Sequence, residues 1–401
     1  MNNIGYVRYS NGSNWYKVTR GNTTYIDGQD KLGLAINHSV LSSLISIRAD
    51  YLSKVRFYIE ESNGDKNFED PLLDFINNPN PHQSKEDFLI QFEWFLCSYG
   101  WVYQRPYLNT RDKGVKYIYN LNPSKIQFPK KMGNSIIITK SDERNYYSKE
   151  FSYQDVDTTK SIKFLDIIPY YDVSNSTNNN ENSSVTSPSR LDSIIRELSN
   201  FTLASDAENI ILQTNGKQIL FSDSAGNALG TVPLQTKDKQ AIKNILNSPL
   251  GFKKGERILT ADKKIVLVDA TIPIKNLGLN ESRETNANVI SQRLQVPNEI
   301  YKAFTQGATF ENQKQAQVSF VQNVTQPRAD DLASSFTTSF GDPNRPYKAS
   351  FEHLPFMQAV EDEKANKALR LSQAMRNLIQ SGLDESDARE FIANLGISVE
   401  I

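Results

Sequence analysis

The sequence contains almost no cysteine, since Cys97 is the only one among 401 residues. A single thiol can form neither an intrachain disulfide nor a metal site built from several thiolates, so both are excluded. The chain also lacks any apolar run near the roughly 18 residues that cross a bilayer as a helix. We therefore expect no membrane span and a fold of two or three domains with packed cores.

An excess of charge of one sign is also missing. The chain carries 45 Lys and Arg against 46 Asp and Glu, which gives a formal net charge of −1. Tight nucleic-acid binders neutralise phosphates with many basic residues, so this balance argues against that class. Residues 1–16 are polar and lack the apolar region of a signal peptide, and we expect the protein in the cytoplasm or in a particle assembled there.

Signatures of catalysis are absent from the sequence. His38, His82 and His353 are far apart, and neither a phosphate-binding GxxxxGK[ST] loop nor a GxSxG turn occurs. Two acidic groups, Asp330-Asp331 and Glu361-Asp362-Glu363, offer carboxylates for a metal. Adjacent helical residues point about 100° apart, which favours solvated surfaces instead. We predict no enzyme activity, no metal and no cofactor.

Two helical patterns near the middle of the chain are unusually polar. One spans 281–294 and a longer one spans 310–336, and Thr305-Gln306-Gly307-Ala308 forms a turn between them. A helix without a clear apolar stripe usually bridges solvent or packs against copies of itself. The pattern indicates a symmetric assembly with a projecting loop, while an ordinary surface helical hairpin is the alternative.

The first 170 residues predict an α+β domain. Apolar residues at helical spacing cover 39–52, and strand-like alternation follows at 55–60. Ser84 occupies the N-cap position before a helix over 85–99, which Gly100 ends. The remaining predicted elements are a short helix at 71–76, strands at 101–107 and 117–119, and a turn and strand at 121–126.

A polar linker separates this domain from a long helix. Residues 174–184 are all Ser, Thr or Asn except Glu181, which predicts a loop. Ser187-Pro188 is typical of a helix start, with Ser187 as N-cap, and Asn215-Gly216 is typical of a helix end. We predict a helix over 189–214, which would be roughly 38 Å long.

Residues 217–277 predict a separate small unit. Stretches 219–221 and 232–234 flank a glycine-bearing turn and indicate a hairpin, 237–246 a short helix and 263–268 a strand. The unit has a local excess of basic residues, namely Lys253, Lys254, Arg257, Lys263 and Lys264. This excess is either a docking surface for a partner or ordinary solvated charge. Beyond residue 350 we predict helices over 361–380 and 386–395.

Several short motifs follow one another over nearly the whole chain. Residues 72–80, Leu-Leu-Asp-Phe-Ile-Asn-Asn-Pro-Asn, precede a helix that starts Ser-x-x-x-Phe at Ser84. Later motifs are Gly100-Trp101-Val102-Tyr103, the turn 121–126, the stretch 283–304 with Val296-Pro297, and 310–316, Phe-Glu-Asn-Gln-Lys-Gln-Ala. In order and spacing they resemble the shorter class of portal proteins of tailed bacteriophages. The chain departs from that pattern at Trp101, where a small polar residue is usual, and at Asn298, where a second proline is usual.

The resemblance implies an α+β portal fold. Its parts would be an N-terminal wing (1–186), a first stem helix (187–216), an inserted small α/β clip domain (217–278), a second stem helix (279–298), a tunnel loop (299–309), a long wing helix with a return segment (310–349) and a short helical crown (350–401).

The resemblance also implies the function of a head–tail connector. Twelve copies would form a ring at one capsid vertex of the virion, through which double-stranded DNA is packaged and ejected. The tunnel-loop residues Lys302, Thr305, Gln306 and Gly307 would meet DNA without sequence specificity, and the five basic clip residues would dock the motor or the adaptor. The implied partners are further copies of the chain, DNA, the terminase large subunit, the head–tail adaptor and the major capsid protein, with no membrane.

Two observations on the residues agree with this interpretation. A near-zero net charge suits a channel, because a strongly basic wall would hold phosphates and stop DNA from sliding. Pro327 lies inside the 310–336 pattern, where it should remove one backbone hydrogen bond and bend the helix. The alternatives are another connector or baseplate component of a phage-like particle, and a DNA-processing enzyme, which should show clustered carboxylates or histidines.

Overall fold

The computed structural model divides the chain into two compact units. One comprises Met1–Thr24 with Ile194–Ile290, and the other comprises Tyr25–Ser193 with Ser291–Ile401. The residues that it describes are 5–8, 15–19, 22–23, 31–108, 115–128, 150–155, 158–172, 185–214, 218–222, 237, 265–269, 278–303, 310–342 and 344–381.

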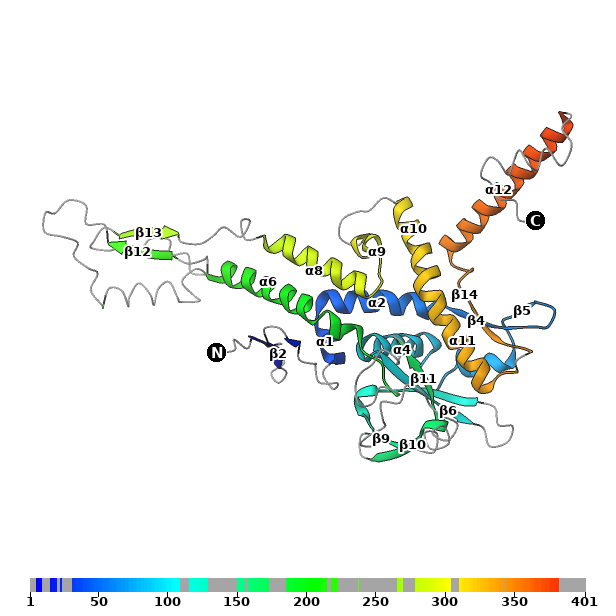
Figure 1. Cartoon of the computed structure of the whole chain (residues 1–401), viewed down its shortest axis with the longest axis horizontal. Helices are drawn as coiled ribbons and strands as arrows, with labels where there is room; N and C mark the ends of the chain where they lie inside the picture. Colours follow the sequence, from blue (N-terminus) through cyan, green and yellow to red (C-terminus); the bar gives the residue numbers. More distant parts are fainter. Residues whose placement is uncertain are drawn as a thin grey trace. The chain divides into compact units, whose positions relative to one another are not determined.

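The described residues of the first unit form two long helices and two small sheets (Figure 1). Helix α6 (Ile195–Thr214) and helix α8 (Leu279–Arg293) are joined by an ion pair between Arg283 and Glu208 at 2.7 Å. Strands β12 (Gln218–Ser222) and β13 (Ile265–Asp269) form an antiparallel pair. The other sheet has the order β1-β2-β3, with β1 at Gly5–Arg8, β2 at Trp15–Thr19 and β3 at Asn22–Thr23.

The small unit predicted at 217–277 is described only in part. Strand β13 confirms the strand predicted at 263–268, and it pairs with β12. The hairpin partner predicted at 232–234 lies outside the described residues, as does the predicted helix 237–246 except for Lys237. Helix α8 confirms the polar helix predicted over 281–294, but it is not polar all round, because a narrow buried seam runs along Ala287, Ile290 and Leu294.

Two packed helices form the centre of the second unit (Figure 1). Helix α2 (Ser39–Ser53) follows the short α1 (Lys31–Asn37), and His38 caps α2 by accepting the Leu41 N–H. Helix α4 (Lys85–Tyr99) begins and ends as predicted, since the Ser84 hydroxyl accepts the Asp87 N–H and Gly100 closes the helix with a φ of 84°. Within the described ranges no single helix has the length and composition of a membrane span, and α1 with α2, the one pair that passes together, is bent by 98°.

The described part of the second unit also contains three small antiparallel sheets and several short helical turns. One sheet has the order β11-β6-β7, with β6 at Trp101–Leu108, β7 at Val115–Leu121 and β11 at Ile168–Tyr171. The second has the order β14-β4-β5, from Tyr347–Ser350, Arg56–Glu60 and Lys66–Asn67. The third has the order β10-β9-β8, from Thr159–Lys163, Glu150–Gln154 and Ile126–Gln127. The turns are η1 (Pro71–Leu73), α3 (Asp74–Asn77), η2 (Pro123–Lys125), η3 (Phe164–Asp166) and η5 (Arg190–Ser193).

The predicted helix over 189–214 is interrupted near its start. Residues 190–193 form the 3₁₀ turn η5, and α6 begins only at Ile195. The predicted N-cap was Ser187, but Ser189 accepts the Leu191 N–H at 3.1 Å and donates to the Ser98 carbonyl at 2.8 Å. Ser189 thus bonds α4 as well as its own turn.

The long helix predicted over 310–336 contains a widened turn. It consists of α10 (Phe310–Phe320), the π-helical turn η7 (Val321–Thr325) and α11 (Gln326–Phe340). In η7 the Gln326 N–H bonds the Val321 carbonyl, five residues back. Pro327 has no N–H and its ring crowds the preceding turn, and a π turn is one way for a helix to continue past such a residue.

The carboxyl-terminal helix is longer than predicted. Helix α12 spans Pro355–Gln380, so it starts before the predicted Glu361 because Pro355 suits the first helical turn. The short α9 (Asn298–Ala303) lies between α8 and α10 in the sequence. The helix predicted over 386–395 lies outside the described residues.

Gly100 should be intolerant of any side chain. A Cβ added there would lie 2.5 Å from the Pro188 carbonyl oxygen, and its positive φ is costly for other residues. We expect Gly100→Ala to lower the free energy of unfolding by about 2–4 kcal/mol. The control is Gly33→Ala in α1, which meets nothing within 4 Å and should be neutral or stabilising. Equal urea midpoints for the two variants would contradict this.

Candidate functional site

Of the nine residues predicted as functional, the structure describes only the backbone of Lys302. Lys302 belongs to the last turn of α9. Thr305, Gln306 and Gly307 lie outside the described residues, as do Lys253, Lys254, Arg257, Lys263 and Lys264. Their roles stay predictions. The most highly charged buried site of the described residues lies elsewhere, in the second unit.

Five charged residues form this site, which we call the arginine–carboxylate cluster: Arg48, Glu93, Asp172, Arg190 and Arg328. Arg48 lies on the buried face of α2, and Glu93 lies on the buried face of α4. Arg48 Nε is 2.7 Å from Glu93 Oε1, and the two side chains are only 3% and 2% exposed. Ions so well shielded from water need several partners each, or they destabilise the fold.

Asp172 is the second carboxylate of the cluster and directly follows β11. It accepts hydrogen bonds from Arg190, at 3.1 Å from Nη2, and from Arg328. Arg328 Nε also lies 3.9 Å from Glu93 Oε2, so this arginine lies between both carboxylates. The Asp172 N–H donates to the Gly100 carbonyl at 2.8 Å, which fixes its backbone beside the end of α4.

The cluster closes the carboxyl end of α8. The last four carbonyls of a helix have no partner within it. Here the Val296 N–H bonds the Ser291 carbonyl and the Gln295 N–H bonds the Gln292 carbonyl, both at 3.0 Å. The two carbonyls that remain accept from arginine side chains: Arg293 O from Arg190 at 3.0 Å, and Leu294 O from Arg48 at 2.6 Å. Each of the last four carbonyls of α8 therefore accepts a hydrogen bond.

The electrostatics of the cluster explain its composition. Three guanidinium groups face two carboxylates, and the end of a helix supplies about half a negative charge toward the balance. Burial would raise the pKa of Asp172, but Arg328 and Arg190 outweigh it and the net shift is downward. Burial would also raise the pKa of Glu93, but the charges of Arg48 and Arg328 outweigh it, and the pKa is lowered overall. Both carboxylates thus remain ionised at neutral pH.

The chemistry of the cluster is structural. The Cys97 thiol donates to Glu93 Oε1 at 3.3 Å, and burial followed by the nearby Glu93 charge raises its pKa, so it is not a reactive thiolate. Nowhere in the described ranges do three His, Cys, Asp or Glu side chains gather as metal ligands. The cluster holds together α2, α4, the end of β11, η5, α11 and the end of α8.

Sequence reasoning missed this cluster, although a signal was present. Arg48 continues the buried spacing of Leu41, Ile45 and Leu52, and Glu93 lies on the same face as Leu89. Charges of opposite sign on the apolar faces of two neighbouring helices are typical of a buried ion pair. Asp172, Arg190 and Arg328 were not recognised, because the residues with which they pair lie far away in the sequence.

Removing one partner of the cluster should be much worse than removing two. Arg48→Met leaves Glu93 buried without its closest partner and Leu294 O without a donor, so we expect a loss of about 3–5 kcal/mol in the free energy of unfolding. The double variant Arg48→Met/Glu93→Met should recover a large part of that loss. The matched control is Lys66→Met in the exposed pair with Glu352, for which we expect less than about 1 kcal/mol. Equal losses for Arg48→Met and Lys66→Met would contradict the role of burial.

Comparison with known proteins supports the fold predicted from the sequence. The sequence profile of the family described as phage portal protein matches residues 39–377. The sequence has no significant match among curated proteins. The sequence profile does not favour the alternative of another connector or baseplate component.

Three solved structures are similar to this chain. A chain in the virion of the native gene transfer agent particle has 13% identity and a TM-score of 0.58, covering 88% of this chain and 94% of that chain. A chain in the neck of the native particle, computed with C12 symmetry, has 12% identity and a TM-score of 0.56, covering 90% and 93%. An HK97-family phage portal protein from Corynebacterium diphtheriae has 10% identity and a TM-score of 0.51, covering 82% and 95%.

At such low identity these likenesses concern the fold, and they confirm the predicted α+β portal fold. The function rests on the sequence profile, which spans most of the chain. On that basis the chain belongs to the phage portal protein family, the head–tail connectors of phage-like particles.

Proposed function

We propose that twelve copies of this chain form a closed ring at one vertex of a phage-like virion, with a central channel for double-stranded DNA. A ring of head-to-tail contacts closes on itself and leaves no unpaired interface. The gene transfer agent neck that resembles this chain was computed with C12 symmetry, which supports the number. The ring is assembled in the host cytoplasm, acts as a passive channel and catalyses no reaction.

The parts of the ring follow the ranges expected from the sequence. The wing is 1–186, the stem helices are 187–216 and 279–298, and the clip is 217–278. The tunnel loop is 299–309, the long wing helix with its return segment is 310–349, and the crown is 350–401. On this division α6 and α8 are stem helices, and α12 belongs to the crown.

The observation that carries the proposal is the way the chain passes between its two units. Besides the crossing at 24–25, it does so at two places, 193–194 and 290–291. The arginine–carboxylate cluster contacts residues beside both places. Arg190 is the first residue of η5, and the carbonyls of residues 293 and 294 accept hydrogen bonds from Arg190 and Arg48. A channel that takes the load of moving DNA needs firm backbone at such places, and within the second unit the cluster provides it.

The exposed residues of α8 support its place in the channel wall. Glu281 and Glu284 are exposed, and most of the other exposed positions on this helix are uncharged. DNA can slide along such a wall, whereas many basic side chains would bind its phosphates and slow it. The tunnel loop, with Lys302, Thr305, Gln306 and Gly307, would then provide brief contacts, since one lysine per copy is screened by salt.

The proposed partners follow from these parts. The clip, through Lys253, Lys254, Arg257, Lys263 and Lys264, docks the terminase large subunit during packaging and the head–tail adaptor afterwards. The major capsid protein surrounds the wing. No membrane takes part.

The mass of the purified full-length chain tests the ring. We expect a closed particle close to twelve times the chain mass of 45.4 kDa. Mass photometry together with averaged images showing a central hole would establish it. A chain that stays monomeric or dimeric at all concentrations would overturn the proposal.

Two charge variants should separate the tunnel loop from the clip. Lys302→Glu should leave rings intact and motor docking normal but slow DNA packaging or lower DNA retention, because it replaces a phosphate contact by repulsion. The triple variant Lys253→Ser/Lys254→Ser/Arg257→Ser should leave rings intact but weaken motor docking. Each variant is the control for the other. If either variant packages DNA normally and gives full heads, the residues that it changes are ordinary solvated charges without the proposed role.

A further inference from the structure

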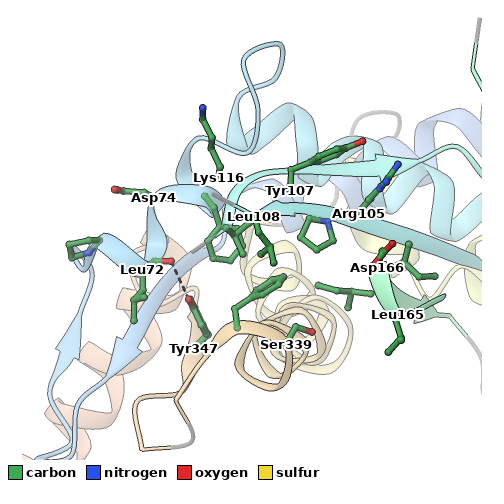
Figure 2. Close-up of a pocket in the computed structure, with 17 residues that line it drawn as sticks. Leu72, Asp74, Arg105, Tyr107, Leu108, Lys116, Leu165, Asp166, Ser339 and Tyr347 are labelled. Carbon is green, nitrogen blue, oxygen red and sulfur yellow. Dashed lines mark hydrogen bonds between the residues drawn. The ribbon is translucent and has the colours of Figure 1, made fainter. Parts of the chain in front are cut away.

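The second unit has a large open groove and, apart from it, a small cavity inside the arginine–carboxylate cluster. The groove, of about 1000 Å³, lies between η1, the β6–β7 pair and the end of α11 (Figure 2). Asp74 and Asp166 balance Arg105 and Lys116 in its lining, so its charges select no particular class of ligand. The cavity in the cluster is far smaller, but its lining is chemically specific.

The cavity lies where α2, α4 and the π turn meet. Three members of the cluster line it, namely Arg48, Glu93 and Arg328. Its lining also includes Leu52 on α2, Phe320 on α10 and Thr325 in η7. The centre of a water molecule has about 10 Å³ in which to lie there, which is room for one water molecule and for no larger ligand.

Packing keeps this space open. Leu52 and Phe320 are each 1% exposed, and the ring of Phe320 packs edge-on against Tyr51 at 5.2 Å. Arg328 is held on its other side by the ion pair with Asp172. Side chains fixed in this way cannot move inward to fill the cavity, since each would lose the contacts that it already makes.

Two polar atoms beside the cavity are shielded from water and have no hydrogen-bond partner among the described residues: Glu93 Oε2 and Arg328 Nε. The other oxygen of Glu93 accepts from Arg48 Nε at 2.7 Å and from the Cys97 thiol at 3.3 Å. Oε2 and Arg328 Nε are 3.9 Å apart, which is too far for a hydrogen bond. Buried polar groups are costly without partners, and a separation of this size is typical of two groups bridged by water.

The charges around the cavity define the class of ligand. A cation would face the guanidinium groups of Arg48 and Arg328, and it could not accept the hydrogen bond that Arg328 Nε offers. An anion would lie against the Glu93 carboxylate and could not donate to Oε2. The ligand therefore carries no charge, accepts one hydrogen bond and donates another. Water meets these requirements in a space of this size.

We propose that one water molecule is bound in this cavity as a permanent member of the arginine–carboxylate cluster. It accepts from Arg328 Nε, donates to Glu93 Oε2 and uses its second hydrogen for the hydroxyl of Thr325, which is 4% exposed. Buried waters typically make about three such bonds. Because Thr325 belongs to η7, the water links the π turn to α4. This inference concerns the second unit alone and does not depend on the ring.

The first test is a crystal structure of the full-length protein at a resolution that shows ordered water, with bromide as the only halide in the buffer. We expect a density peak in the cavity at about 2.7–3.2 Å from both Glu93 Oε2 and Arg328 Nε, without the anomalous signal of bromide. A bromide peak there, an empty cavity, or a direct hydrogen bond between the two side chains would overturn the inference.

The second test removes the hydroxyl of Thr325 while keeping the shape of the side chain. Without one of its partners the water holds the π turn less firmly, so in Thr325→Val the Gln326 amide, which bonds the Val321 carbonyl, should exchange about five- to tenfold faster. In a dry cavity the added methyl group would leave this exchange unchanged or slow it.

The matched control for this test is Thr338→Val in α11. The Thr338 hydroxyl is exposed and donates to the Ser334 carbonyl at 3.0 Å, so its loss should leave the exchange of the Gln326 amide unchanged. Equal exchange of that amide in wild type and Thr325→Val, or slower exchange in the variant, would show that no water joins Thr325 to the cluster.

Discussion

Three guanidinium groups and two carboxylates, whose side chains are each at most 11% exposed, lie together in this protein, and none can be left without partners. The cost of an unpaired buried charge is several kcal/mol, so each of these ions requires the others in place. They come from segments that lie far apart in the sequence, from residue 48 to residue 328. The requirement that each of these charges be paired fixes how α2, α4, β11 and α11 pack against one another.

The same charged residues also hold the ends of neighbouring elements. Arg48 and Arg190 donate to the last carbonyls of α8, in addition to the two backbone bonds of its final turn. Arg328 comes directly after Pro327, close behind the π turn at 321–325. One extra residue in a helix rotates the later turns by about 100°, so the π turn sets the direction in which Arg328 points relative to α10.

Local features of the fold were predictable because they depend on a few adjacent residues. The cap at Ser84, the end at Gly100 and the polar α8 follow from side chains within one or two turns. The cluster was not predictable as a whole, since Asp172, Arg190 and Arg328 resemble solvated charges until distant helices bury them. The π turn was also missed. Pro327 predicts that one backbone hydrogen bond is lost, but it does not tell whether the helix bends or widens there. The tunnel-loop and clip residues remain predictions from the resemblance.

The central claim is that the cluster holds the end of α8 as firmly as the core holds α4. Amide hydrogen exchange measures this directly, because a frayed helix end exchanges by local opening and a fixed one only by global unfolding. The account predicts that the Gln295 and Val296 amides are protected to within about tenfold of the slowest amides of α4. Exchange of these two amides at the rate of an open helix end, while α4 stays protected, would contradict it.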